Sequence, residues 1–314
     1  MYSLILLTLA AVTALAQPTS GPGGSDYRHK QTVVHEYGRG ATSFWLYEPA
    51  EPRPASAPVV VFLHGWGAMQ PRPYEAWIEH IVRRGNIVIY PRYQDSWLTS
   101  PAAFTPNAVA AIKSALRELQ SGDHAQPDLE RVAVVGHSMG GAMTANIAAV
   151  AGKEGLPAPK AIMPVEPGSH AKNHEFPRMP LADFRKIPAT ALMLVVVGDN
   201  DARAGTADAK LIFRLTPQIT PTNKNYVTLV SDRHGTPPLR ATHHAPLAAN
   251  GGWSRWSVDA LDFFGTWKLF DALTEAAFYG THREFALGNT PQQRFMGLWS
   301  DGVPVKELVV TDRP

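Results

Sequence analysis

Short apolar runs alternate with amphipathic stretches along most of the chain. The runs rich in apolar residues predict strands at 58–63, 86–90, 131–135, 161–163, 190–197 and 225–230. Helical spacing or composition predicts helices between and after them, at 74–84, 106–120, 138–151, 207–215 and 258–278. Because strands and helices alternate from residue 58 onward, we predict an α/β fold. Its sheet is mostly parallel, of an eight-stranded type, with helices on both faces.

The two ends of this pattern differ from its middle. Residues 32–37 and 42–47 alternate or are rich in aromatic residues, which predicts a leading antiparallel pair of strands. The tail 294–314 predicts a short hairpin packed on the body. Residues 164–186 join two predicted strands and are too few for a separate cap domain, so we expect an open site.

The N-terminus has the pattern of an export signal. An apolar run fills residues 4–16, ends in Ala14-Leu15-Ala16, and no charged side chain precedes Asp26. The run is too short to span a hydrocarbon core of about 30 Å comfortably. It predicts a secretory signal peptide that is cut after Ala16, and therefore a secreted or periplasmic protein. An uncleaved hydrophobic anchor or a misassigned start is the alternative. No later segment approaches a membrane span.

Composition removes several classes of chemistry. The 314 residues include no cysteine, which excludes disulfides, a cysteine nucleophile, zinc–thiolate sites and iron–sulfur clusters. The formal net charge is +2 and no block of Lys or Arg stands out, so nucleic acid is not indicated as a partner. The hydrophobic share of 45% is that of a globular protein.

The strongest chemical signal is the run Gly136-His-Ser-Met-Gly140, which follows an apolar strand and precedes a helix of small residues. The glycines permit a sharp strand-to-helix turn that exposes the hydroxyl of Ser138 above the carboxyl edge of the sheet. The start of the helix favours a negative charge that develops beside it. We therefore predict that Ser138 is a nucleophile.

A second signal, His64-Gly-Trp-Gly67, directly follows the predicted strand 58–63. Serine hydrolysis needs two backbone N–H donors aimed at the oxyanion. We expect one from Met139, just after the nucleophile, and the other from Trp66. A plain glycine turn is the alternative for the loop.

Together these two motifs resemble the α/β-hydrolase superfamily, and within it the lid-poor serine esterases of the dienelactone hydrolase and bacterial cutinase type. The resemblance covers roughly residues 30–280. With the termini, we divide the chain into a signal peptide 1–16, a linker 17–25 that composition predicts to be flexible, an α/β-hydrolase domain 26–290 and a C-terminal extension 291–314 packed on that domain. The resemblance implies a triad in the chain order Ser, acid, His.

The resemblance leaves alternatives for the acid and the base. The acid follows the strand predicted at 190–197, and the family spacing, three residues after Gly198, selects Asp201 over Asp199. The base follows the last core strand. His243 matches the family pattern of a histidine followed by x-Ala-Pro, whereas distance along the chain favours His234, nine residues earlier. His244 is a third candidate.

Two weaker signals accompany the triad. Glu166, His170 and His174 are spaced four apart, but Pro167-Gly168 breaks the helix that would align them, so a loop beside the site is favoured over a metal site. The loop after residue 90 also lies at the carboxyl edge of the sheet. This loop contains two aromatic residues, Tyr93 and Trp97. They either line the acyl or alcohol pocket or are ordinary surface residues.

These residues predict a secreted serine hydrolase that cleaves carboxylic esters through an acyl-enzyme. Its expected partner is a small-molecule or polymeric ester, with short-chain, lipid and polyester substrates all open, and no cofactor or metal is expected. Other acyl-transfer activity, as a peptidase or perhydrolase, is the alternative within the superfamily. A catalytically inactive exported binding protein is the alternative outside enzymes.

Overall fold

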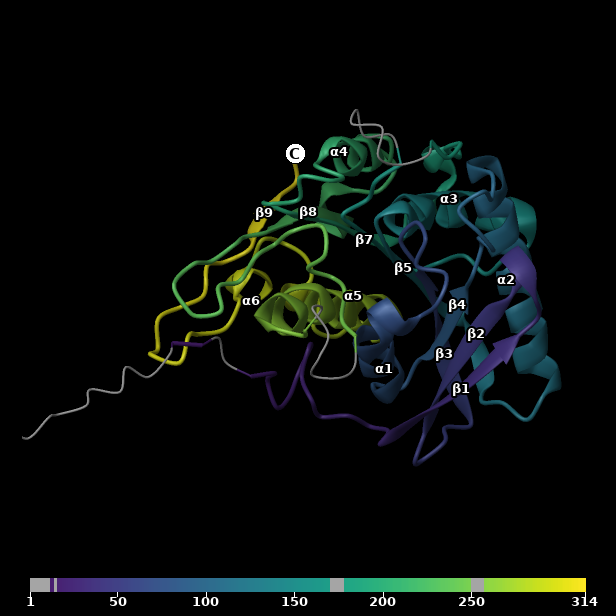
Figure 1. Cartoon of the computed structure of the whole chain (residues 1–314), viewed down its shortest axis with the longest axis horizontal. Coiled ribbons are helices and arrows are strands. Elements are labelled where there is room, and N and C mark those ends of the chain that lie inside the picture. Colours follow the sequence, from purple (N-terminus) through teal and green to yellow (C-terminus); the bar gives the residue numbers. More distant parts are fainter. Residues whose placement is uncertain (1–11, 14–15, 170–177, 250–256) are drawn as a thin grey trace, which may run out of the picture.

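The computed structural model describes residues 12–13, 16–169, 178–249 and 257–314. Within these residues a nine-stranded sheet runs in the order β1-β2-β4-β3-β5-β6-β7-β8-β9 (Figure 1). The strands from β4 to β8 in this order are parallel, and β1, β2 and β9 add antiparallel edges. The bounds are β1 Gln31–Tyr37, β2 Phe44–Ala50, β3 Ser56–Leu63, β4 Ile87–Pro91, β5 Gln126–His137, β6 Ala161–Val165, β7 Leu192–Gly198, β8 Lys224–Leu229 and β9 Val309–Thr311.

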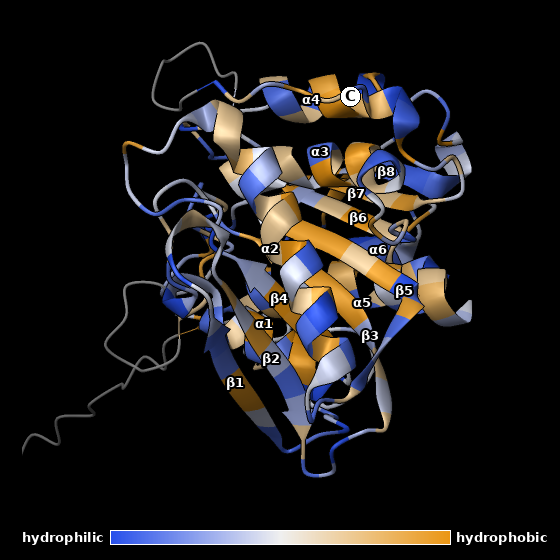
Figure 2. Ribbon diagram, turned by 90° about the vertical axis from the view of Figure 1, so that its right-hand side faces the viewer, coloured by the Kyte–Doolittle hydropathy of each residue, from blue (hydrophilic) through white to orange (hydrophobic). Residues whose placement is uncertain are grey.

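Helices cover both faces of the sheet, as the sequence predicts. Helices α1 (Glu75–Arg83) and α5 (Lys268–Tyr279) lie on one face; α2 (Pro101–Ser121), α3 (Met139–Glu154) and α4 (Ala207–Arg214) lie on the other (Figure 1). The central strands are therefore buried on both sides, which explains their continuous apolar sequence (Figure 2). The short α6 spans Pro291–Arg294. Single 3₁₀ turns occupy Gly40–Thr42, Arg72–Tyr74, Phe184–Lys186, Pro221–Asn223 and Arg283–Phe285.

The structure refines three predicted elements. Helix α2 begins at Pro101 rather than at Pro106, which lies inside the helix. The long helix predicted at 258–278 opens with a π-helical segment, Leu261–Trp267, before α5. In the tail, where the sequence predicts a short hairpin, a single β-bridge joins Leu298 and Pro304. Residues Val309–Thr311 instead pair with β8 and form β9, a ninth strand that the sequence did not predict.

The N-terminal region differs from the expectation of a flexible linker at 17–25. Pro22, Gly23 and Gly24 are buried, and the Gly23 N–H donates to Oδ2 of the buried Asp271 at 2.8 Å. The segment is therefore attached to α5 by a hydrogen bond to Asp271. Composition alone does not reveal this acceptor, because it lies far away in the sequence. Residues 1–11 and 14–15 of the predicted signal peptide lie outside the described residues. Over the described part of the chain, no helix has the length and apolar character needed to cross a membrane.

Candidate active site

Ser138 occupies a sharp turn between β5 and α3. Its backbone is left-handed, with φ 59° and ψ −120°, a conformation that costs a residue with a side chain about 1–3 kcal/mol. Two hydrogen bonds hold it: the Ser138 N–H donates to the carbonyl of Val165 at 3.0 Å, and the Gly168 N–H donates to the carbonyl of Ser138 at 3.0 Å. The neighbouring strand and loop thus stabilise a turn that presents the hydroxyl at the carboxyl edge of the sheet.

The turn also requires close packing of α3 on β3. A Cβ atom at Gly140 would collide with the backbone carbonyl oxygens of Leu63 and His64. We expect Gly140→Ala to lower the free energy of unfolding by about 2 kcal/mol or more, because backbone cannot yield as a side chain can. Urea denaturation measures this change.

The same helix offers a matched control. Apart from its own helix, no atom of the described residues lies within 4 Å of the place that a Cβ at Gly152 would take. Gly152→Ala should leave stability unchanged or raise it by up to about 1 kcal/mol, because alanine is the better helix former. Equal stability of the two variants would contradict the close packing at Gly140.

Three predicted residues meet at this edge of the sheet. The Ser138 Oγ lies 2.9 Å from Nε2 of His243, and Nδ1 of His243 lies 2.8 Å from Oδ2 of Asp201. Each of the three is less than one tenth exposed. With Nδ1–H donating to the carboxylate, Nε2 is left as the acceptor for the serine hydroxyl. This is the geometry of a nucleophile, a base and an orienting acid.

Asp201 is held as a carboxylate. Burial raises its pKa, but the hydrogen bond and charge of His243 oppose this, together with N–H donors from Ala204 and Arg203, each at 2.9 Å from Oδ1. The net result is a pKa below the ordinary value of an aspartate. The group therefore stays ionised at neutral pH and accepts a hydrogen bond from the Nδ1–H of His243.

The other candidates for acid and base lie elsewhere. Asp199 accepts hydrogen bonds from the backbone and hydroxyl of Ser231, at 2.9 and 2.5 Å. His234 lies 2.8 Å from Oδ2 of Asp301, in the C-terminal segment. The ring of His244 lies 3.3 Å from Arg203. Of the three histidines, the structure brings His243 to the serine.

One predicted oxyanion donor is the residue after the serine, and the other belongs to a loop beside it, where a Cβ at Gly65 would lie 3.3 Å from the Cβ of Ser138. The N–H of Met139 belongs to the first residue of α3, where the helix itself offers no acceptor. In the loop, the Gly65 N–H donates to the hydroxyl of Tyr74 at 2.9 Å and the Gly67 N–H to Oε1 of Gln94 at 3.0 Å. The backbone N–H of Trp66, between these two, has no hydrogen-bond partner among the described residues, so it is available for a ligand.

The two predicted pocket aromatics have different surroundings. Tyr93 is buried, and its hydroxyl donates to the carbonyl of His64 at 2.7 Å, so it is a core residue and not a pocket wall. Trp97 is 59% exposed and packs edge-to-face on Trp66 at 4.7 Å between ring centroids. Leu98 beside it is 93% exposed. An apolar surface therefore adjoins the loop that carries the free amide.

Comparison with known proteins agrees with this architecture. A family model described as the α/β hydrolase fold matches residues 60–208, which include Trp66, Ser138 and Asp201. The match and the strand order together give the chain the α/β-hydrolase fold. No curated protein matches the sequence of this hydrolase. The matched region ends before His243, so the position of that histidine rests on the geometry.

Beneath these three residues the hydrolase contains an inner layer of buried polar groups, of which the sequence singled out only Glu166. The hydroxyl of Tyr74 lies 2.9 Å from Nδ1 of His137, and Nε2 of His137 lies 2.9 Å from the backbone carbonyl of His243. Burial lowers the pKa of His137 to about 4, so the ring is neutral, with its proton on Nε2 and donated to that carbonyl. One chain of hydrogen bonds thus connects Gly65 to His243.

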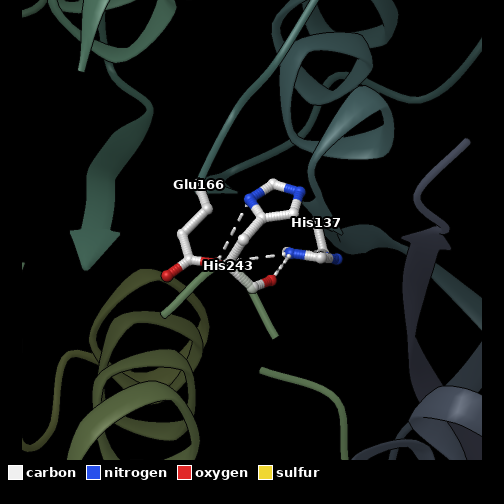
Figure 3. Close-up of side chains that lie close together, drawn as sticks. All are labelled: His137, Glu166 and His243. Atoms are coloured by element: carbon white, nitrogen blue, oxygen red, sulfur yellow. Dashed lines mark hydrogen bonds and ion pairs between the residues drawn. The ribbon is translucent and has the colours of Figure 1, made fainter. Parts of the chain in front are cut away.

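Glu166 completes this inner layer. Its carboxylate, with the rings of His137 and His243, offers three potential ligand atoms within 4.8 Å (Figure 3). Both rings are already engaged, however: Nε2 of His137 by a carbonyl, Nδ1 of His243 by Asp201. A metal would have to break both bonds, so the group does not fit a metal centre. His170 and His174 lie outside the described residues.

Proposed function

We propose that this hydrolase is a secreted or periplasmic serine esterase that cleaves carboxylic esters through an acyl-enzyme. The observation that carries the proposal is the continuous series of hydrogen bonds from Ser138 through His243 to Asp201, located at a strained turn. Strain of this kind at a reactive hydroxyl has no evident structural use, and it is typical of catalytic sites. For export, the proposal rests on the apolar run and the small-residue pattern that ends at Ala16.

Acylation follows from the positions of these groups. As the Ser138 Oγ forms a bond to the ester carbonyl carbon, its proton passes to Nε2 of His243, and the carbonyl electron pair moves onto oxygen. The amides of Met139 and Trp66 donate to this oxyanion. Collapse of the intermediate breaks the bond to the alkoxy oxygen, which leaves as an alcohol with the proton from His243. Asp201 stabilises the imidazolium in between.

Deacylation repeats the same steps with water. His243 takes a proton from the attacking water, a second oxyanion forms between the same two amides, and the carboxylic acid departs as Ser138 recovers its proton. No further group is required. The apolar surface formed by Trp97 and Leu98 favours an ester with an apolar acyl or polymer segment over a charged one.

A serine-directed phosphonate tests the proposal. The expected result is covalent labelling at Ser138, mapped by peptide mass spectrometry, together with turnover of p-nitrophenyl esters across a series of acyl chain lengths. Heat-denatured protein is the control, because labelling there would report only general reactivity. Folded protein that neither reacts nor turns over any ester of the series would refute the proposal and favour a binding role. Turnover of peptide bonds without ester turnover would favour a peptidase.

A further inference from the structure

Glu166 is an unusual residue in its position. It follows β6 directly, at the same sheet edge as Ser138 and Asp201, and its backbone is left-handed with φ 45°. Its side chain is fully buried, and neither carboxyl oxygen has a hydrogen-bond partner among the described residues. A buried carboxyl without a hydrogen bond is costly, so its presence calls for a role.

The carboxyl lies against the proposed base. Oε2 of Glu166 is 3.7 Å from Nδ1 of His243 and 3.3 Å from Nε2 of His137 (Figure 3). The first of these nitrogens is the one that Asp201 binds at 2.8 Å. Two carboxyl groups from two neighbouring strands therefore approach the same N–H, one in hydrogen-bond contact and the other about 1 Å short of it.

The two carboxyl groups differ in charge. Burial raises the pKa of Glu166 well above its ordinary value, the charge of His243 lowers it, and the carboxylate of Asp201 raises it further. The other titratable groups that face it are the neutral His137 from β5 and, beyond that ring, Tyr74. Glu166 is thus a neutral acid while Asp201 is ionised, because burial disfavours the charged form of Glu166 and the adjacent Asp201 carboxylate repels it.

We propose that Glu166 is a second acid for His243, a positioning residue that replaces Asp201 when that carboxylate is removed. This inference rests on the proposed esterase function. Loss of the Asp201 carboxylate removes one of the two causes that raise the pKa of Glu166, and it leaves the Nδ1–H of His243 without that acceptor. Glu166 then releases its proton to solvent and accepts this N–H after a shift of about 1 Å. The imidazole then keeps the same tautomer, with Nε2 directed at Ser138.

The test compares wild type with Asp201→Ala, Glu166→Gln and the double variant. Losing the acid of a triad ordinarily lowers kcat by about 10⁴-fold. We expect Asp201→Ala to lose less than about 100-fold, Glu166→Gln only several-fold, and the double variant the full loss of about 10⁴-fold. Glutamine mimics the neutral acid in shape; if that variant does not fold, Glu166→Met fills the same space without a carboxyl.

The pH profile separates this role from a structural one. In Asp201→Ala, an ionised Glu166 stabilises the imidazolium. The acid limb of kcat/KM should therefore lie at higher pH than in the double variant. If Glu166 only supports the fold, the acid limb of kcat/KM should lie at the same pH in Asp201→Ala and in the double variant.

A second buried glutamate provides the control. Glu48 on β2 also contacts a histidine, with Oε1 2.6 Å from Nδ1 of His124, but β2 is separated from the strand that leads to Ser138 by β4 and β3. Glu48→Gln should leave the activity of Asp201→Ala unchanged. If Asp201→Ala alone already loses about 10⁴-fold and Glu166→Gln lowers it no further, the inference is wrong, while wild-type turnover and labelling keep the esterase proposal intact. Wild type without turnover would instead refute the proposed function.

Discussion

Replacing Ser138 by alanine is expected to lower kcat for ester hydrolysis by about 10⁶-fold, the loss found when a triad nucleophile is removed. The change removes one oxygen atom at a position that is 3% exposed, so it leaves almost no cavity. It also relieves no backbone strain, because alanine keeps the Cβ that makes φ 59° unfavourable. The fold should therefore persist while the chemistry is lost.

Steady-state turnover of a p-nitrophenyl ester measures this effect. Ser43→Ala is the matched control, since Ser43 is also buried but its hydroxyl donates to the carbonyl of Gly40 at 2.8 Å rather than to a triad residue. That variant should lose about 1 kcal/mol of stability and none of its activity. If Ser138→Ala keeps more than a few per cent of wild-type kcat, Ser138 is not the nucleophile.

Replacing His243 by alanine should cause a loss of similar size, about 10⁶-fold in kcat, because the serine loses its general base. His243 contacts both Ser138 and Asp201, so its removal breaks both hydrogen bonds at once. His234→Ala removes a ring whose partner is Asp301 on the tail. That second variant should remain within a few-fold of wild type.

The two histidine variants are compared at saturating ester, with thermal unfolding recorded for each. Such a comparison decides between the two bases that the sequence left open. A large loss in His234→Ala together with an active His243→Ala would reverse the assignment. If both variants fold and lose the same activity, both histidines of the loop are needed for turnover. The pH profile of each variant would then identify the base.

The sequence predicted the sheet well because its signal is local. Each central strand is apolar on both faces, and glycines bracket the turn at Ser138, so neither feature depends on a distant residue. The choice between His234 and His243 depends on distant contacts. Asp232 pairs with Leu239 through two backbone hydrogen bonds, and the indole of Trp299 donates to its carboxylate at 3.1 Å. This bend contains His234 and lets the chain return toward the serine.

Two further features, the packing of residues 17–25 and the position of Glu166, depend on contacts with residues that are far away in the sequence. The buried Asp271, which binds Gly23, made a glycine-rich segment part of the domain. The carboxyl of Glu166 was considered only as one of three evenly spaced metal-ligand candidates. Its signal was present nonetheless, since a carboxylate directly after a buried parallel strand reaches the edge where ligands bind.

The hydrogen-bond chain from Gly65 through Tyr74 and His137 to the carbonyl of His243 limits how this enzyme can be redesigned. Substitutions that reshape the inner side of the site will shift the loop of the oxyanion amide and the base together, and so trade specificity against turnover. On the outer side, no hydrogen bond among the described residues connects Trp97 or Leu98 to the proposed base. Directed evolution toward bulkier esters should therefore accumulate its tolerated changes there.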